Sequence, residues 1–203
     1  NRSATASTRS PRAAESAVTA TLTEPALKEW SAAIHALLDG TQTVLLRKGG
    51  IHEKRFEVAA DRFLLFPTVA HSHAQRVRAE HREFLEAAAT DSTEDEVVLR
   101  AGARVVAAIE VQRPENVNEL VPLHIWTAES VQQDRLDFRP RHRLTVLVVS
   151  AAPLTVPQRL ARTPDHRGCA SWVQLPVHPE WAEPVHDDAT LQDVAAWVRR
   201  SVG

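Results

Sequence analysis

Thr43-Val-Leu-Leu-Arg-Lys-Gly-Gly-Ile-His-Glu53 is the stretch of sequence around which the fold is organised. Its apolar run, residues 43–46, is short and is followed closely by two cations and a pair of glycines. An apolar run of this length next to a glycine turn is typical of a buried strand. The stretch therefore predicts a strand that leads into a tight, basic turn.

Upstream of this strand, apolar residues recur at steps of three and four across residues 26–39. This spacing predicts one helix over 26–39, with a capping box formed by Thr21 and Glu24 and a left-handed stop at Gly40. Residues 63–66 predict a second strand that ends at Pro67, because proline cannot donate to a continuing ladder.

The rest of the chain alternates between helical and strand patterns. Residues 71–89 predict an exposed helix, and the acidic residues 91–96 predict a surface linker. Further strands are predicted at 97–99, 104–111, 124–126 and 144–149, the last of them central, with helices at 127–135 and 190–202. Prolines at 153, 157 and 164 are expected to confine that region to edges and loops.

This order of elements predicts the α+β class, with a mixed, partly closed, barrel-like sheet and flanking helices. An open α/β sheet of the restriction-endonuclease type is the alternative. The 203 residues are enough for one domain, which we expect over residues 21–203 after a disordered leader at 1–20.

Composition excludes several classes of protein. No apolar run approaches the roughly 20 residues that span a bilayer, so we expect no membrane partner. The single cysteine, Cys169, allows no intrachain disulfide, which favours a reducing, cytoplasmic compartment. The net charge of −2 argues against non-specific coating of nucleic acid, although a local basic stripe remains compatible with it.

The first candidate site is the RKGG turn, which consists of Arg47, Lys48, Gly49 and Gly50. Glycine lets the backbone approach a ligand closely, and backbone N–H groups beside two cations can hold an anion such as a phosphate. The spacing of a Walker loop is absent, so an ATPase is not predicted. The alternative is a tight turn whose cations are solvated.

The second candidate site is a basic cluster of Arg135, Arg139, Arg141, His142 and Arg143, interleaved with Phe138 and Pro140. We call its main part, residues 138–143, the arginine loop. Guanidinium groups match phosphate oxygens, and an exposed aromatic ring can stack on a base. The loop is therefore a candidate nucleic-acid groove. The alternative is a solvated loop whose arginines pair with nearby aspartates.

Several short segments of the sequence resemble those of a known family. They are Ala26-Leu-Lys-Glu-Trp30, Leu45-Leu-Arg-Lys-Gly-Gly-Ile51, Phe63-Leu-Leu-Phe-Pro-Thr68, Phe138-Arg-Pro-Arg-His-Arg143 and Gly168-Cys-Ala-Ser-Trp-Val173. Across residues 22–176 the chain resembles a bacterial family described as domain of unknown function 1802. The resemblance implies boundaries but no activity.

A second resemblance is to the barrel group of activating-signal-cointegrator homology (ASCH) and pseudouridine-synthase-associated domains, whose motif is G-x-K-x-x-E-x-R. Gly40 and Arg47 match this motif, whereas Gln42 replaces the lysine and Leu45 replaces the glutamate. The resemblance implies a helix followed by a barrel. The two departures favour binding over catalysis.

Other residues suggest weaker alternatives. A metal-dependent nuclease would use Glu110 with Asp95 or Glu96, although Gln112 stands where a lysine is expected. His71 and His73, completed by His81 or Glu80, could hold a metal, but such histidines more often lie at the surface or cap a helix. Cys169 could pair with His166 or His142, but a lone cysteine more often packs as a small buried hydrophobe. A protein-interaction domain has no positive signature.

The sequence thus favours a cytoplasmic binding module for an anionic ligand such as nucleic acid. We expect the ligand to contact Arg47, Lys48, Gly49, Gly50, Arg139, Arg141 and Arg143. We expect no cofactor and no metal, and the sequence leaves enzymatic activity undecided.

Overall fold

A mixed β-sheet dominates the computed structural model, which describes residues 22–50 and 53–203. Its strands are β1 (Glu24–Trp30), β2 (Val44–Lys48), β3 (Arg62–Thr68), β4 (Glu96–Glu110), β5 (Leu144–Ala161) and β6 (Trp172–Leu175). The strand order is β2-β5-β4-β3-β1-β6. The β1–β3 pair is parallel and the other pairs are antiparallel.

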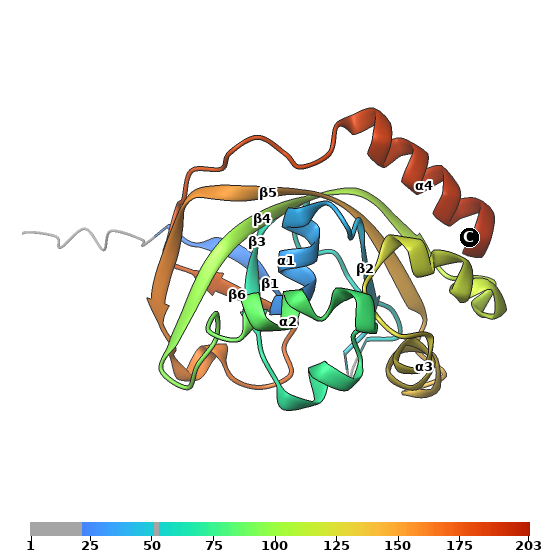
Figure 1. The fold of residues 1–203 in the computed structure, drawn as a ribbon, viewed down its shortest axis with the longest axis horizontal. Coiled ribbons are helices and arrows are strands. Elements are labelled where there is room, and N and C mark those ends of the chain that lie inside the picture. The colour runs from blue at the N-terminus through green and yellow to red at the C-terminus, as the bar shows by residue number, and fades with distance from the viewer. Residues whose placement is uncertain (1–21, 51–52) are drawn as a thin grey trace, which may run out of the picture.

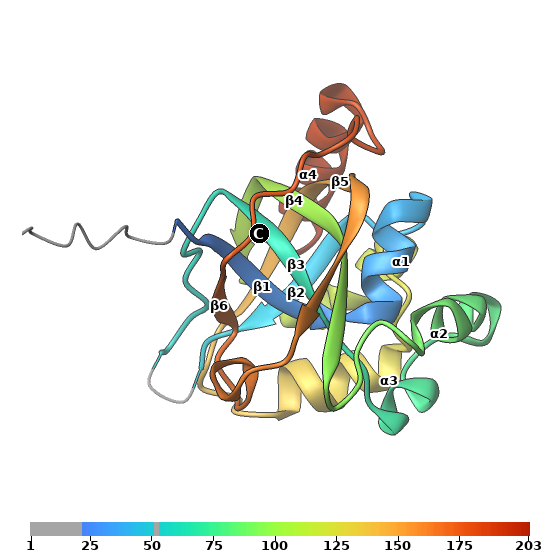
Figure 2. The ribbon, with the colours of Figure 1, turned by 90° about the vertical axis from the view of Figure 1, so that its left-hand side faces the viewer.

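The sheet curves strongly, as the two views show (Figure 1, Figure 2). The β4–β5 ladder changes register between Leu99 and Ala101 and again between Val105 and Ala107. Such irregularities bend a strand and increase its twist. Strands β2 and β6 are the edges, so the sheet is barrel-like without closing. The predicted α+β class with a mixed, barrel-like sheet and flanking helices is confirmed.

Helices pack around this sheet. The α-helices are α1 (Ser31–Asp39), α2 (Glu83–Ala88), α3 (Ala128–Val131) and α4 (Asp188–Val202). Short 3-10 helices are η1 (His71–Gln75), η2 (Ala79–His81), η3 (Pro114–Leu123) and η5 (Pro164–His166), and η4 (Gln132–Asp137) is a π-helical turn. None of the described helices is both long and apolar enough to cross a bilayer.

Strand β2 is buried on both faces although it lies at an edge. Val44 and Leu46 pack into one apolar cluster, which also contains Leu191 and Val198 of α4. Leu45, which points to the opposite face, packs into a second cluster that contains residues of α1. Burial on both faces explains why the sequence of this strand is a continuous apolar run, and it confirms the predicted strand.

The predicted helix over 26–39 is wrong in its first part. Residues 24–30 form β1, which lies between β3 and β6, and the helix begins only at Ser31. Ala26 and Leu27 are both fully buried, because β1 is covered on both faces. An apolar pattern of this kind fits a buried strand as well as a helix. The stop at Gly40 is confirmed, with a φ of 89°. Thr21, half of the predicted capping box, lies outside the described residues.

Other boundaries also differ from the predictions. The runs 97–99 and 104–111 belong to one strand, β4, and β5 continues past two prolines to Ala161. Residues 124–126 form no strand, and only Trp126 makes a bridge, to Val77. The helix predicted over 71–89 is divided into η1, η2 and α2. The strand at 144–149 and the helices near 127–135 and 190–202 are confirmed.

Candidate functional site

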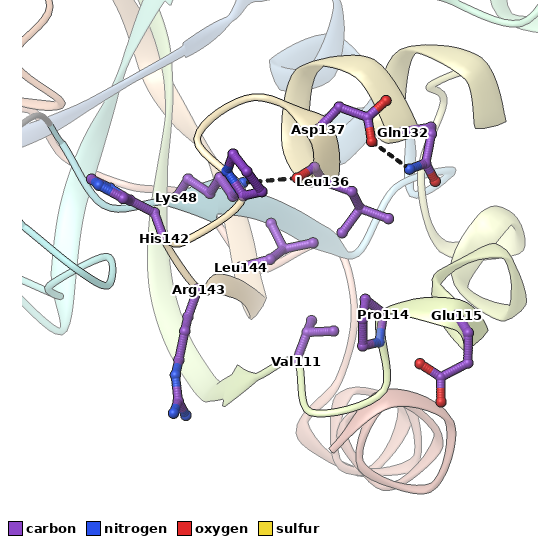
Figure 3. Close-up of a pocket in the computed structure, with 11 residues that line it drawn as sticks. Lys48, Val111, Pro114, Glu115, Gln132, Leu136, Asp137, His142, Arg143 and Leu144 are labelled. Carbon is purple, nitrogen blue, oxygen red and sulfur yellow. Dashed lines mark hydrogen bonds between the residues drawn. The ribbon is translucent and has the colours of Figure 1, made fainter.

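The RKGG turn and the arginine loop lie side by side. Strand β2 pairs antiparallel with β5, and Lys48, the last residue of β2, lies opposite Leu144, the first residue of β5. The segment that follows β2 therefore meets the segment that precedes β5. Figure 3 shows Lys48, His142 and Arg143 around this junction. The two segments that carry the predicted cation clusters thus lie next to each other.

Lys48 fixes the backbone of the segment that leads into the arginine loop. Its ammonium donates to the carbonyl oxygens of Leu136 at 3.3 Å and Arg139 at 2.9 Å, and to that of Phe138. Burial lowers the pKa of Lys48, and the nearby guanidinium of Arg135 lowers it further. The ammonium is therefore a positioning group for the loop rather than a free cation at the surface.

The loop that Lys48 fixes presents an aromatic ring and two cations to solvent. The side chain of Phe138 is 55% exposed, and the guanidinium of Arg139 lies 4.8 Å from the centre of its ring. Arg139 has a φ of 50° and is the only non-glycine residue with positive φ among the described residues. Arg139 and Arg141 form no ion pair within the described part of the chain.

Backbone strain at Arg139 is informative. A non-glycine residue in the left-handed region costs of order 1–3 kcal/mol, and such residues concentrate at binding and catalytic sites. The three carbonyl contacts from Lys48 supply the restraint that holds this conformation. The arginine loop thus contains one strained residue, and Lys48 restrains the backbone around it.

Arg143, the third arginine of the loop, is paired. Its guanidinium forms an ion pair with Glu110 at the end of β4, and its backbone N–H donates to the carbonyl oxygen of Lys54 at 2.9 Å. The hydrogen bond from Arg143 holds the pKa of Glu110 below its usual value. Arg143 therefore contributes less free positive charge to this face than its two neighbours do.

Arg47 turns inward, which was not expected. Its side chain is only 13% exposed and donates to the carboxylate of Glu29 at 3.1 Å and to the carbonyl oxygen of Lys28 at 3.0 Å. The guanidinium also lies over the ring of Phe56, at 5.2 Å. Because Arg47 is committed to these partners, we exclude it from the surface that contacts a ligand.

The glycines of the RKGG turn already hold an anion of the chain itself. The N–H of Gly50 donates to the carboxylate of Glu53 at 3.2 Å. A side chain on Gly49 would collide with the carbonyl oxygens of Glu53 and Arg55, the latter 2.7 Å from the added carbon. Glycine is therefore required at position 49, because the backbone of residues 53–55 passes too close to it for a side chain. The carboxylate of Glu53 binds the N–H of Gly50, which is the group that a phosphate would use. Ile51 and His52 lie outside the described residues.

The residues of the nuclease alternative are far apart. Glu96 begins and Glu110 ends the 15-residue strand β4, so the two carboxylates lie at opposite ends of it. Glu96 forms an ion pair with Arg159, whereas Glu110 pairs with Arg143. In residues 22–50 and 53–203, no three His, Cys, Asp or Glu side chains are placed to hold a metal ion. The predicted carboxylates do not form a nuclease centre.

Two of the predicted histidine candidates are structural. His73 stacks on Trp30 with 3.6 Å between ring centres, and burial lowers its pKa to about 4. His166 is buried and accepts a hydrogen bond from the N–H of Thr163, while Cys169 is exposed. His73 is therefore part of the packing rather than a surface histidine, and the exposure of Cys169 differs from the buried, structural cysteine that the sequence favoured.

Sequence reasoning missed a buried charged cluster centred on Asp91. This residue was predicted in a surface linker but is only 1% exposed. Its carboxylate accepts from Ser31 at 2.8 Å and Arg100 at 2.8 Å, and it lies 2.6 Å from His35. These partners come from α1 and β4, so no local spacing signals the cluster.

A cavity of about 480 Å³ lies beside the arginine loop. Val111, Pro114, Leu136 and Leu144 supply apolar walls. Gln132 and Asp137 of η4 line it too, and the amide of Gln132 donates to the carboxylate of Asp137 at 2.7 Å (Figure 3). The candidate site therefore combines an exposed cationic loop with an adjacent cavity whose lining is part apolar and part polar or charged.

Comparison with known families agrees with the first of the two resemblances. The model of the family described as Domain of unknown function (DUF1802) matches residues 26–196. Search of the curated proteins gives no match.

Three solved structures of an ASCH protein from Zymomonas mobilis resemble the chain. Two are single-residue variants, with 13% and 14% identity, TM-scores of 0.41 and 0.40, and coverage of 85% of this chain and of 95% and 96% of theirs. The unsubstituted protein has 10% identity and a TM-score of 0.43, with coverage of 84% of this chain and 94% of its own. At this level of similarity, the likeness supports no activity or ligand for this chain.

Proposed function

The chain belongs to the DUF1802 family, and we propose that it binds single-stranded nucleic acid through the arginine loop. The ligand is anionic, and Arg139 and Arg141 make the primary phosphate contacts. We place the protein in the bacterial cytoplasm, where a single exposed thiol, Cys169, stays reduced. Lys48 acts as a positioning residue, and Arg143 extends the surface.

One observation carries this proposal. Lys48 restrains the loop through three carbonyl oxygens while the ring of Phe138 remains 55% exposed beside the guanidinium of Arg139. An exposed aromatic ring costs free energy, because apolar surface stays in water. A restrained loop that exposes such a ring next to cations is suited to stack on a base and to contact the adjoining phosphates.

Stacking also distinguishes between single strands and duplexes. A base inside a duplex has both faces covered by its neighbours, so an exposed ring such as Phe138 can stack only on an unpaired base. Guanidinium groups on either side of Pro140 can then bind successive phosphates through paired N–H donors. The chemistry of the loop therefore favours single-stranded RNA or DNA over duplexes.

Fluorescence anisotropy with a labelled 12-nucleotide RNA tests the proposal. We expect Arg139→Ala with Arg141→Ala to weaken binding about tenfold or more at ~100 mM salt. The slope of log K against log salt should fall by about 1.4, since each phosphate contact on a single strand contributes ~0.7. A 12-base-pair duplex should bind more weakly than the single strand.

The matched control is Arg82→Ala with Arg167→Ala, which removes two exposed arginines from other parts of the fold. This control should bind as the parent does. If it loses as much affinity as the loop variant, the effect is one of total charge and the proposal is wrong. An unchanged affinity in the loop variant also contradicts the proposal.

Incubation of the labelled RNA or DNA with the parent and magnesium or manganese addresses the nuclease alternative. We expect no cleavage. Cleavage by the parent that Glu110→Ala abolishes would replace the binding proposal with an enzymatic one, because Glu110 is the carboxylate that this alternative requires.

A further inference from the structure

We infer that the cavity beside the arginine loop receives one unstacked nucleobase that carries an exocyclic amino group, namely adenine or cytosine. This inference rests on the proposed function, because the same strand must also contact the arginine loop. It adds base specificity to a surface that otherwise binds phosphates and stacks on any base.

The cavity has the size and walls of a small-molecule site. Its volume of about 480 Å³ falls within the range of roughly 300–1,000 Å³ that is usual for ligand sites. Val111 and Leu144, which line it, are buried, and Leu136 and Pro114 add further apolar lining (Figure 3). The flat faces of a base are weakly hydrated, so apolar walls of this kind are suited to enclose them.

Three donor side chains line the cavity, and each already has a partner: Lys48 contacts the carbonyl oxygen of Leu136, His142 contacts that of Gly49, and Arg143 pairs with Glu110. The other polar side chains of the lining supply mostly hydrogen-bond acceptors. The amide of Gln132 donates one N–H to Oδ1 of Asp137 at 2.7 Å. This leaves the carbonyl oxygen of Gln132 and the second oxygen of Asp137 as acceptors, and Glu115 adds another carboxylate. Acceptors of this kind pair with the amino groups of adenine and cytosine and repel the carbonyl oxygens of uracil.

The cavity is continuous with the proposed phosphate contacts. Pro140, His142 and Arg143 line it, and they alternate along the loop with Arg139 and Arg141. A nucleotide whose phosphate lies on Arg141 therefore has its base within reach of the cavity. The preceding or following base is then free to stack on Phe138, whose ring is exposed.

Lys48 restrains both the arginine loop and one wall of the cavity. Its side chain lines the cavity, and its ammonium donates to the carbonyl oxygen of Leu136, one of the apolar walls. The backbone of this wall is thus fixed by the same group that fixes the loop. Such preformed walls reduce the ordering cost of binding, which favours selection between bases of similar size.

Anisotropy measurements with three labelled RNA hexamers, of adenosine, cytidine and uridine, test the inference. We expect the parent to bind the adenosine or cytidine hexamer about tenfold more tightly than the uridine hexamer, which is the scale of one good base contact. Gln132→Ala with Asp137→Asn should remove this preference and leave uridine binding within about twofold of the parent.

The chain offers a matched control one residue away. The amide of Gln133 donates to the carboxylate of Glu129 at 3.0 Å, so this pair has the same chemistry but does not line the cavity. Gln133→Ala with Glu129→Gln should keep the base preference. Thermal unfolding of both double variants shows whether each is folded at the assay temperature.

The outcomes separate the two proposals. Equal affinity of the parent for all three hexamers, together with weaker binding by the Arg139→Ala with Arg141→Ala variant, overturns the base cavity and leaves the proposed function standing. Absence of binding to every hexamer and to the 12-nucleotide RNA overturns both. A preference that survives Gln132→Ala with Asp137→Asn places base selection elsewhere and also overturns the inference.

Discussion

The ammonium of Lys48 lies 2.9 Å from the carbonyl oxygen of Arg139, a residue 91 positions later in the chain. This contact joins the last residue of an edge strand to a loop whose backbone is strained at the contacted residue. It restrains the backbone of a loop that carries three arginines. The exposed surface of the loop depends on a lysine that does not itself reach solvent freely.

Replacement of Lys48 by methionine is expected to loosen the loop. Hydrogen bonds to charged groups contribute roughly 1.5–3 kcal/mol each, and a loosened loop must be ordered again on binding. Lys48→Met should therefore weaken RNA binding roughly three- to tenfold and accelerate amide hydrogen exchange in residues 136–143. Lys54→Met, which removes an exposed lysine nearby, should leave the exchange unchanged. Unaltered exchange in Lys48→Met would contradict the positioning role.

The two glycines of the RKGG turn should respond differently to alanine. A Cβ on Gly49 meets two backbone carbonyl oxygens, whereas a Cβ on Gly50 comes no closer than 3.6 Å to Glu53. Gly49→Ala should lower the free energy of unfolding by about 1–3 kcal/mol, as overpacking does, and Gly50→Ala should change it little. Urea unfolding of both variants measures this difference, and equal effects would show that the close return of the backbone is unimportant.

His124 should make stability depend on pH. Burial lowers its pKa from 6.5 to about 3, so the folded protein keeps the ring neutral. The unfolded chain takes up a proton near pH 6.5, which favours unfolding below that pH. The free energy of unfolding therefore carries the full contribution of neutral His124 above pH 6.5. This contribution decreases by up to about 1.4 kcal/mol per pH unit as the pH falls towards 3.

His124→Asn is the variant that isolates this effect. Nδ1 of His124 accepts from the N–H of Trp126 at 3.1 Å, and the side-chain oxygen of asparagine can accept the same bond. Urea unfolding between pH 7 and 4 should show a shallower loss of stability in this variant than in the parent. His71→Asn, at an exposed histidine, should keep the slope of the parent. The prediction is wrong if both variants have equal slopes.

Asp91 should be the most sensitive carboxylate to replacement. Burial raises its pKa, but hydrogen bonds from His35, Arg100 and Ser31 outweigh burial and hold the pKa below its usual value. Removal of one partner from a buried pair costs about 3–5 kcal/mol, so Asp91→Asn should lower the free energy of unfolding by roughly that amount.

The pH dependence gives a second test of Asp91. The pKa of Asp91 is lower in the folded state than in the unfolded chain, where it is near 4. Ionised Asp91 therefore stabilises the fold fully above pH 4, and this stabilisation is lost as the pH falls through the pKa of the folded state. Asp91→Asn should lack this acid-induced loss. Asp95→Asn, an exposed neighbour, should change neither stability nor its pH dependence. Similar losses in the two variants would rule out a special role for the cluster.

The sequence by itself determined the features that depend on neighbouring residues. Strand β2, the left-handed end of α1 at Gly40 and helix α4 follow from a short apolar run, a glycine and a helical apolar spacing. The arginine loop was also evident, since its cations and its aromatic ring are contiguous. These features are local because each depends on backbone propensity and on side-chain spacing within one segment.

Only the tertiary structure decided which of the candidate residues share a surface. Antiparallel pairing of β2 with β5 brings Lys48 to the arginine loop, whereas an ion pair with Glu29 withdraws Arg47 from solvent. Strand β1 and the environment of Asp91 likewise depend on partners distant in sequence. Pairing and burial of this kind are set by the whole sheet, so a pattern within one segment does not reveal them.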